Sequence, residues 1–147
     1  MKYSTKLSDT IHLLVFLYLA EGDRITSAKI AESVKTNPAY IRQLMSALKK
    51  GGLISSDRGQ ANAALTRTAD QITMLDIYRA VEGEKPLLHL DTHTNPECGV
   101  GIHIQLSLRD YFDQVQRTAE EEMEKITLQE ILERYQEKLL HSDGHTG

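Results

Sequence analysis

Cysteine, tryptophan and long apolar runs are scarce in this chain of 147 residues. Its single cysteine, Cys98, excludes an internal disulfide framework and favours a reducing compartment. The longest uninterrupted apolar run extends from Leu13 to Ala20, well short of the roughly 20 residues that cross a bilayer. No pattern of basic, apolar and small residues indicates a signal peptide. We therefore expect a cytoplasmic protein without membrane partners, and the absence of tryptophan decides nothing.

A net positive charge is also absent, because the formal charge at pH 7 is -4, which at first sight argues against a nucleic-acid partner. The distribution of charge changes that interpretation. Residues 1–70 contain ten Lys and Arg against six Asp and Glu, whereas residues 71–147 contain seven against fifteen. The first part is thus +4 and the second -8. A basic part can attract phosphates while an acidic part supplies solubility and disfavours indiscriminate coating of DNA.

The most informative stretch is residues 36–54. Asn37 is a good N-cap and Pro38 suits the first helical position, so a helix is predicted to begin there and to stop at Gly51-Gly52. Its apolar residues recur at three- and four-residue steps and form a stripe to be buried, which consists of Ile41, Leu44, Met45 and Leu48. The opposite face is polar and basic and carries Ala39, Tyr40, Arg42, Gln43, Ser46, Lys49 and Lys50.

Arg42 and Gln43 lie in the leading turns of this predicted helix, where a recognition helix contacts base edges. Arg can make paired hydrogen bonds to guanine, and Gln can make them to adenine. The alternative is a solvated helix face, which is what such side chains usually form when taken alone. The flanking segments favour DNA reading.

Upstream, Thr26 is a good N-cap for a short apolar helix, and residues 35–37 form a tight turn before the helix at Pro38. Two short helices joined in this way are typical of a helix-turn-helix. Downstream, residues 53–56 and 63–66 are predicted to be short strands around a turn at 57–62. A hairpin directly after a recognition helix is a wing.

These segments together resemble the Rrf2 family of bacterial winged-helix transcription regulators. The resemblance covers most of the chain and is carried by residues 26–31, by 38–41 with 43–44, by 48–56 with 58–59, and by 72–77 with 82–83. Two features depart from the family pattern. The usual Gly-Gly-Tyr of the wing is replaced by Ala61-Asn62-Ala63-Ala64, and Arg42 stands at a position that is often acidic.

The resemblance implies a mainly α fold with a small β wing and a long C-terminal dimerisation helix. It also implies a homodimeric regulator, whose two-fold symmetry would suit palindromic double-stranded DNA. Repression is the commoner expectation for a small regulator with no separate activation segment. In this interpretation Arg42 and Gln43 read base edges, Tyr40, Lys49 and Lys50 position phosphates, and Arg58 on the wing enters a minor groove. The predicted DNA-binding residues are Ser27, Pro38, Ala39, Tyr40, Arg42, Gln43, Lys49, Lys50 and Arg58.

After the wing, Thr73 and Asp76 form a predicted capping box for a helix that ends at Gly83. Residues 84–101 are predicted to be a connector with two prolines and little periodicity. This region and the residues just after it contain side chains that suit a transition metal, namely His89, His93, Cys98 and His103. Their spacing is loose, so we expect solvated histidines and no metal site.

From Ile102 the pattern becomes helical over more than twenty residues. We predict that residues 102–140 are dimerisation helices, the second starting at a capping box at Thr127, and that residues 141–147 form a disordered tail. The predicted dimerisation residues are Ile104, Leu108, Tyr111, Phe112, Val115 and Ala119. The alternative is a long helix lying on its own domain. Residues 1–83 form the predicted DNA-binding domain.

Two other functions compete with DNA reading. One is a winged helix used only for protein contacts, and the other is an enzyme, for which no nucleophile with its base and no phosphate-cradling loop is visible. Family members that sense through an iron-sulfur cluster carry three cysteines in the connector, whereas this chain has only Cys98. We therefore expect no cofactor, with Cys98 either a buried small residue or an oxidant-sensitive thiol. The sequence does not identify a small-molecule or redox effector.

Overall fold

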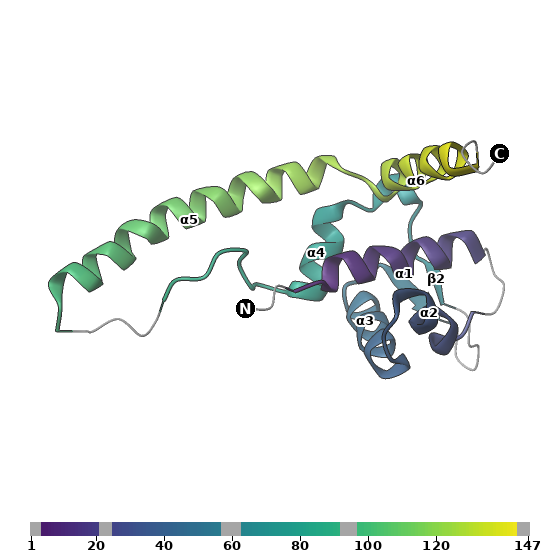
Figure 1. The fold of residues 1–147 in the computed structure, drawn as a ribbon, viewed down its shortest axis with the longest axis horizontal. Helices are drawn as coiled ribbons and strands as arrows, with labels where there is room; N and C mark the ends of the chain where they lie inside the picture. The colour runs from purple at the N-terminus through teal and green to yellow at the C-terminus, as the bar shows by residue number, and fades with distance from the viewer. Residues whose placement is uncertain (1–3, 21–24, 57–62, 92–96, 144–147) are drawn as a thin grey trace.

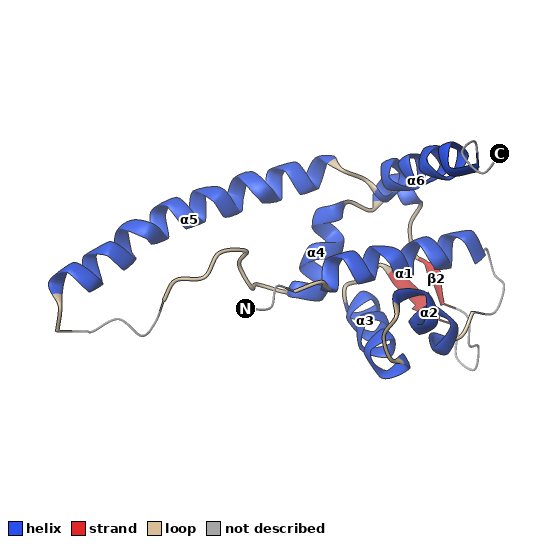
Figure 2. Cartoon of the chain, viewed as in Figure 1, coloured by secondary structure: helices blue, strands red, loops and turns tan. Residues whose placement is uncertain are grey.

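The computed structural model describes residues 4–20, 25–56, 63–91 and 97–143, and it is mainly helical with one small sheet (Figures 1 and 2). The elements run, in chain order, α1 (Lys6–Ala20), α2 (Ser27–Val34), α3 (Pro38–Lys50), β1 (Ile54–Ser56), β2 (Ala63–Leu65), a short 3-10 helix η1 (Ala69–Gln71), α4 (Met74–Glu82), α5 (Gly99–Lys125) and α6 (Leu128–Asp143). This architecture confirms the predicted fold class.

Helices α2 and α3 form the predicted helix-turn-helix. The Thr26 side chain accepts from the Lys29 amide at 3.2 Å, and Asn37 accepts from the Tyr40 amide at 2.8 Å, so both predicted N-caps are present. Between the helices Lys35 adopts a left-handed conformation with φ 62°, which reverses the chain within a few residues. The apolar stripe of α3 faces the core, since Ile41, Leu44 and Leu48 are buried.

The wing is an antiparallel pair in which Ile54 lies opposite Leu65 and Ser56 opposite Ala63. The predicted strand segments were each one residue longer than the observed β1 and β2. Gly52, with φ +75°, takes the chain from the end of α3 toward β1, a backbone conformation that suits glycine. The wing's turn, residues 57–62, lies outside the described residues.

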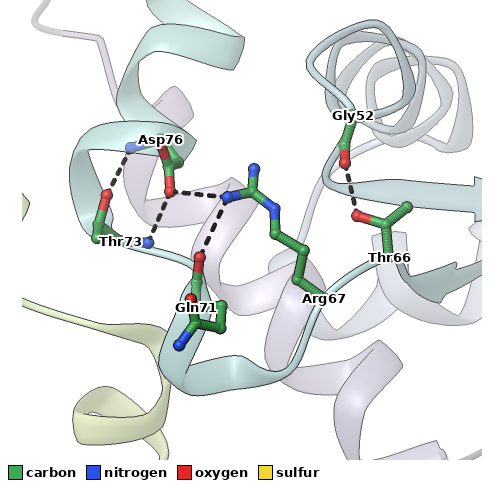
Figure 3. A network of polar contacts seen from close by, with 6 residues as sticks. All are labelled: Gly52, Thr66, Arg67, Gln71, Thr73 and Asp76. Carbon is green, nitrogen blue, oxygen red and sulfur yellow. Dashed lines mark hydrogen bonds and ion pairs between the residues drawn. The ribbon is translucent and has the colours of Figure 1, made fainter.

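A polar network fastens the end of the wing to the start of α4 (Figure 3). The Arg67 guanidinium donates to the Gln71 carbonyl at 3.1 Å and lies 3.5 Å from Asp76 Oδ2. Asp76 also accepts from the Thr73 amide at 3.0 Å, while Thr73 accepts from the Asp76 amide at 3.1 Å. The predicted capping box of α4 is therefore present.

Helix α5 projects away from the rest of the molecule (Figure 1). It begins at Gly99, three residues before the predicted start, and none of the 27 residues described for it is buried. Its main contact within the chain is with α4. The connector joins this contact, because the Leu87 amide donates to Gln116 Oε1 at 2.8 Å. The start of the connector thus contacts the helix that brings the chain back to α4.

Helix α6 returns to the winged helix. The Met74 amide donates to the Ile126 carbonyl at 2.7 Å and the Leu128 amide to the Ile72 carbonyl at 2.8 Å, which fixes the end of α5 beside the start of α4. Leu128 and Leu132 are buried in the same cluster as the apolar residues of α1, α2 and α3. The predicted grouping of α6 with α5 in residues 102–140 therefore does not describe its packing.

Two further differences concern the ends of α6 and α1. Helix α6 runs to Asp143, so residues 141–143 are helical rather than part of the predicted tail, because no glycine or proline interrupts the sequence before Gly144. Helix α1 is covered by α2, α3, α4 and β2, and only its last turn leaves a large apolar side chain exposed, that of Leu19. Its predicted stop at Gly22 lies outside the described residues.

Candidate nucleic-acid interface

The outward face of α3 carries the predicted base-reading side chains. Arg42, Gln43, Ser46, Lys49 and Lys50 are exposed, while the opposite stripe is buried. At about 100° per residue, Arg42 and Lys49 lie on one flank of this face and Gln43 and Lys50 on the other. Two shallow depressions flank the helix accordingly.

The first depression lies between α3, the start of α2 and the wing. It is lined by Ser27, Arg42, Met45, Ser46, Lys49, Ser56 and Ala63. The structure thus brings Ser27, Arg42 and Lys49, three of the predicted DNA-binding residues, to one surface. The Ser27 hydroxyl lies 3.9 Å from the Met45 sulfur, which keeps α2 close to the helix that carries the cations. The two cations and three serine hydroxyls of this lining can bind phosphate oxygens.

The second depression lies between α3 and α4. It is lined by Gln43, Ser46, Ala47, Lys50, Gly51, Arg79 and Ala80. The two helices approach closely here, because a Cβ placed on Gly51 would lie 3.0 Å from the Ala80 Cβ. Arg79 is not among the predicted DNA-binding residues, because the spacing of the residues in α4 does not connect it with α3. The one sequence feature that relates to its position is the small size of Gly51 and Ala80, which permits the two helices to approach closely.

Tyr40 lies elsewhere than predicted. Its side chain is partly buried against the core, and its hydroxyl donates to Asp9 Oδ2 at 2.9 Å. Burial, followed by the hydrogen bond and the charge of Asp9, raises the pKa of Tyr40 to about 12. Helix geometry explains this position. Each residue advances the helix by about 100°, so Tyr40 lies that much closer than Ala39 to the buried stripe. Tyr40 therefore ties α3 to α1 and does not lie on the open face.

The remaining predicted DNA-binding residues are divided between the surface and the undescribed turn. Ala39 is exposed and Pro38 partly buried at the start of α3. Arg58 lies outside the described residues, so its role on the wing stays a prediction.

The predicted dimerisation stripe of α5 divides into two sets. Ile104, Tyr111 and Val115 are exposed, with Tyr111 66% exposed, whereas Leu108, Phe112 and Ala119 are partly covered. Val100, one turn before Ile104 on the same side, is 77% exposed and was missed because the helix was predicted to begin at residue 102. An apolar row along an exposed helix marks a surface for a partner.

Cys98 precedes the first residue of α5 and is exposed, so the expectation of a buried cysteine is wrong for the isolated chain. Its side chain makes no capping hydrogen bond to the helix. The first turn of α5, which Cys98 precedes, lies at the outer end of the projection, away from α3 (Figure 1).

Residues 3–134 match the Rrf2 family, which is described as iron-dependent transcriptional regulators. This chain belongs to the Rrf2 family. Its function is accordingly transcription regulation through a DNA-binding winged helix, and its relatives are named as regulators rather than enzymes. Among the described residues, no helix combines the length and apolar character needed to cross a membrane.

Several Rrf2 relatives match over most of their length. The chain is 34% identical over 129 residues to YwnA of Bacillus subtilis, named as an HTH-type transcriptional regulator, covering 88% of this chain and 96% of YwnA. It is 31% identical over 116 residues to the HTH-type transcriptional regulator CymR of the same organism, covering 77% and 84%. A crystal structure titled as that of a DNA-binding protein superposes with a TM-score of 0.71 at 33% identity, covering 86% of this chain and 98% of the other.

The iron named in the family description can be tested against the donor set of this chain. An iron-sulfur cluster is held mainly by thiolates, and one chain supplies a single thiolate, Cys98. Within the described residues no three His, Cys, Asp or Glu side chains form a group that could hold a metal ion. His93 lies outside that part of the chain. The residues of one chain therefore do not fit the cluster.

Proposed function

We propose that this Rrf2-family protein is a homodimeric, sequence-specific regulator that binds a palindromic operator through α3. The observation that carries the proposal is the exposed face of α3, where Arg42 and Gln43 can contact base edges. Lys49 and Lys50 extend this face with cations that suit phosphates. Ser27, Pro38 and Ala39 border it, and Arg58 of the wing is proposed to reach a neighbouring minor groove.

Dimerisation is proposed because α5 cannot bury its apolar row within one chain. Exposed Val100, Ile104, Tyr111 and Val115 follow one side of a helix about 40 Å long. A second copy of the same row would cover it, and a two-fold axis is the commonest arrangement for two identical subunits. The relatives' names do not mention an assembly, so this step rests on the packing of α5.

A two-fold dimer dictates the form of its DNA site. Two α3 helices would read half-sites whose centres lie about 34 to 36 Å apart, or a multiple of that distance, so the operator should be palindromic. Repression is the simplest outcome of binding, because a dimer that covers an operator excludes other proteins from the same DNA. The excess of basic residues lies in the first part of each protomer, which contains α3, and the excess of acidic residues lies in the second part.

Recovery of bound genomic fragments by the purified protein tests this proposal. We expect a small set of fragments that share a palindrome, and protection of both half-sites in footprinting. A winged helix used only for protein contacts would recover fragments without a common sequence or none at all. The Arg42→Ala variant is the control, because it should relax the shared sequence at one base pair per half-site while keeping the fold.

A further inference from the structure

Arg79 belongs to two surface features at once. It lines the depression between α3 and α4 together with Gln43, Ser46 and Lys50. It also lines a third depression, between the end of α4, the connector and α5, and Glu120 is another of the residues that line it. Its Nη2 atom lies 3.3 Å from Glu120 Oε1. One guanidinium therefore stands between the DNA-reading helix and the projecting helix.

The ion pair to Glu120 leaves the Arg79 guanidinium largely open to solvent. The Arg79 side chain is 63% exposed and that of Glu120 is 26% exposed, and ion pairs open to solvent contribute little to stability. A guanidinium held so weakly can exchange its partner for a phosphate, to which it can make two parallel hydrogen bonds. Lys50 lines the same depression, so a phosphate there would meet two cations.

We propose that Arg79 binds a backbone phosphate of DNA beside α3, together with Lys50, and that it leaves Glu120 to do so. This inference rests on the proposed function, in which α3 lies in a major groove. The strands that border that groove carry one negative charge per phosphate, and the α3–α4 depression opens beside Gln43, a proposed base-reading residue. Arg79 is thus a phosphate-binding residue contributed by α4.

The same exchange connects DNA binding with α5. Glu120 lies on α5, so DNA that takes Arg79 removes one link between α4 and the projecting helix. DNA and Glu120 therefore compete for the Arg79 guanidinium. By thermodynamic reciprocity, any change in α5 that draws Glu120 away from Arg79 strengthens DNA binding. The hydrogen bond from Gln116 to the Tyr78 hydroxyl keeps α5 attached to α4 while the pair is open, and the bond from the Leu87 amide to Gln116 keeps α5 attached to the connector.

The test compares two variants that break the same ion pair, Arg79→Gln and Glu120→Gln. Affinity is measured by fluorescence anisotropy against NaCl concentration, on a duplex carrying the recovered palindrome and on a random duplex. Arg79→Gln should weaken binding to both duplexes and reduce the slope of log K against log salt by about 0.9 for each protomer bound. Glu120→Gln should tighten binding up to about fivefold, because Arg79 is then free.

Matched controls separate these effects from a general change of charge. Arg134 on α6 is 74% exposed and pairs with Glu137, so Arg134→Gln removes an equivalent cation far from α3 and should leave the salt slope unchanged. Glu121→Gln removes the neighbouring exposed acid of α5 and should tighten binding less than Glu120→Gln. The double variant Arg79→Gln with Glu120→Gln should behave as Arg79→Gln alone. Thermal unfolding and mass of each variant confirm an unchanged fold and assembly.

The outcomes are distinct. If Arg79→Gln and Glu120→Gln weaken binding alike, the pair is only a structural link and the inference is wrong. An unchanged salt slope for Arg79→Gln would also overturn it, while leaving DNA reading by α3 intact if Arg42→Ala still weakens binding to the palindrome and relaxes its base choice. A wild type that binds neither duplex would overturn both this inference and the proposed function.

Discussion

The Tyr40 hydroxyl donates a 2.9 Å hydrogen bond to Asp9 Oδ2, and this contact ties the first turn of α3 to α1. The two residues are 31 positions apart, so the bond sets the direction from which the reading helix leaves the core. Asp9 also accepts from the Thr5 hydroxyl at 3.1 Å. The stability of this junction and its pH dependence can be measured.

We predict that Tyr40→Phe lowers the free energy of unfolding by about 1 kcal/mol at pH 7, because one partly buried hydrogen bond is lost. The pKa of Tyr40 is raised from 10.0 to about 12, so neutral Tyr40 stabilises the folded state fully below about pH 10. That contribution is lost as pH rises through about 12. Urea unfolding of both proteins between pH 7 and 11 should show a constant difference in the free energy of unfolding up to about pH 10 and a smaller difference above it.

Tyr135→Phe serves as the control for this experiment, because Tyr135 is an exposed tyrosine of α6 and should show almost no difference at any pH. Equal stability of Tyr40→Phe and wild type at pH 7 would contradict the assigned role.

For the reading face, we predict that Arg42→Ala or Gln43→Ala weakens binding to the recovered palindrome by about 1 to 3 kcal/mol and relaxes the choice at one base pair per half-site. Lys49→Ala should weaken the palindrome and random DNA alike, because it contacts only phosphate. Binding to a panel of single-base variants of the palindrome measures both effects. Arg42→Ala with unchanged affinity for every duplex would show that Arg42 is simply solvated.

For the assembly, we predict that Val115→Asp dissociates the dimer and greatly weakens operator binding, because each half-site alone holds one protomer poorly. Val115 is exposed in the chain, so the substitution should not disturb the protomer itself. Light scattering should report 16.6 kDa instead of twice that mass. The control is Gln114→Asp, which adds the same charge at the adjacent exposed position. A wild type that is already monomeric yet binds the palindrome fully would contradict the proposed dimer.

For the connector, we predict a colourless protein after anaerobic purification, since one thiolate per chain does not satisfy a cluster. Exposed Cys98 is open to peroxide, and its oxidation should alter operator binding if the thiol is a sensor and should leave it unchanged if it is not. Binding of wild type and Cys98→Ser before and after peroxide separates the two roles. Visible absorbance with stoichiometric iron would contradict the first prediction, and identical responses of the two proteins would exclude a sensor at Cys98.

Much of the fold could be predicted because its signals are local. The caps at Thr26 and Asn37 and the boxes at Thr73 and Thr127 need only residues three positions apart, and all four are present. The buried stripe of α3 likewise follows from its helical period.

What could not be predicted depends on distant contacts. Tyr40 was assigned to the open face because Asp9, its partner, lies in another helix. Arg79 became relevant only through the close approach of Gly51 to Ala80. The pattern of α6 showed an amphipathic helix, but not that Leu128 and Leu132 complete the core of the winged helix. The helical period and the capping residues specify a helix, whereas the elements that it packs against depend on contacts between distant parts of the chain.

The chain leaves α4 at one end and returns to it at the other, and this has a consequence for how the regulator can change in evolution. The connector leaves at Gly83, just after α4, and Ile126 is hydrogen-bonded to Met74, at the other end of the same short helix. Residues 84–125 are therefore an insertion into a domain whose core contains residues on both sides of it. An insertion whose two ends lie on one short helix of its host can be lengthened, shortened or replaced while the host keeps folding. Such a chain can acquire a different projecting segment without redesigning the part that binds DNA.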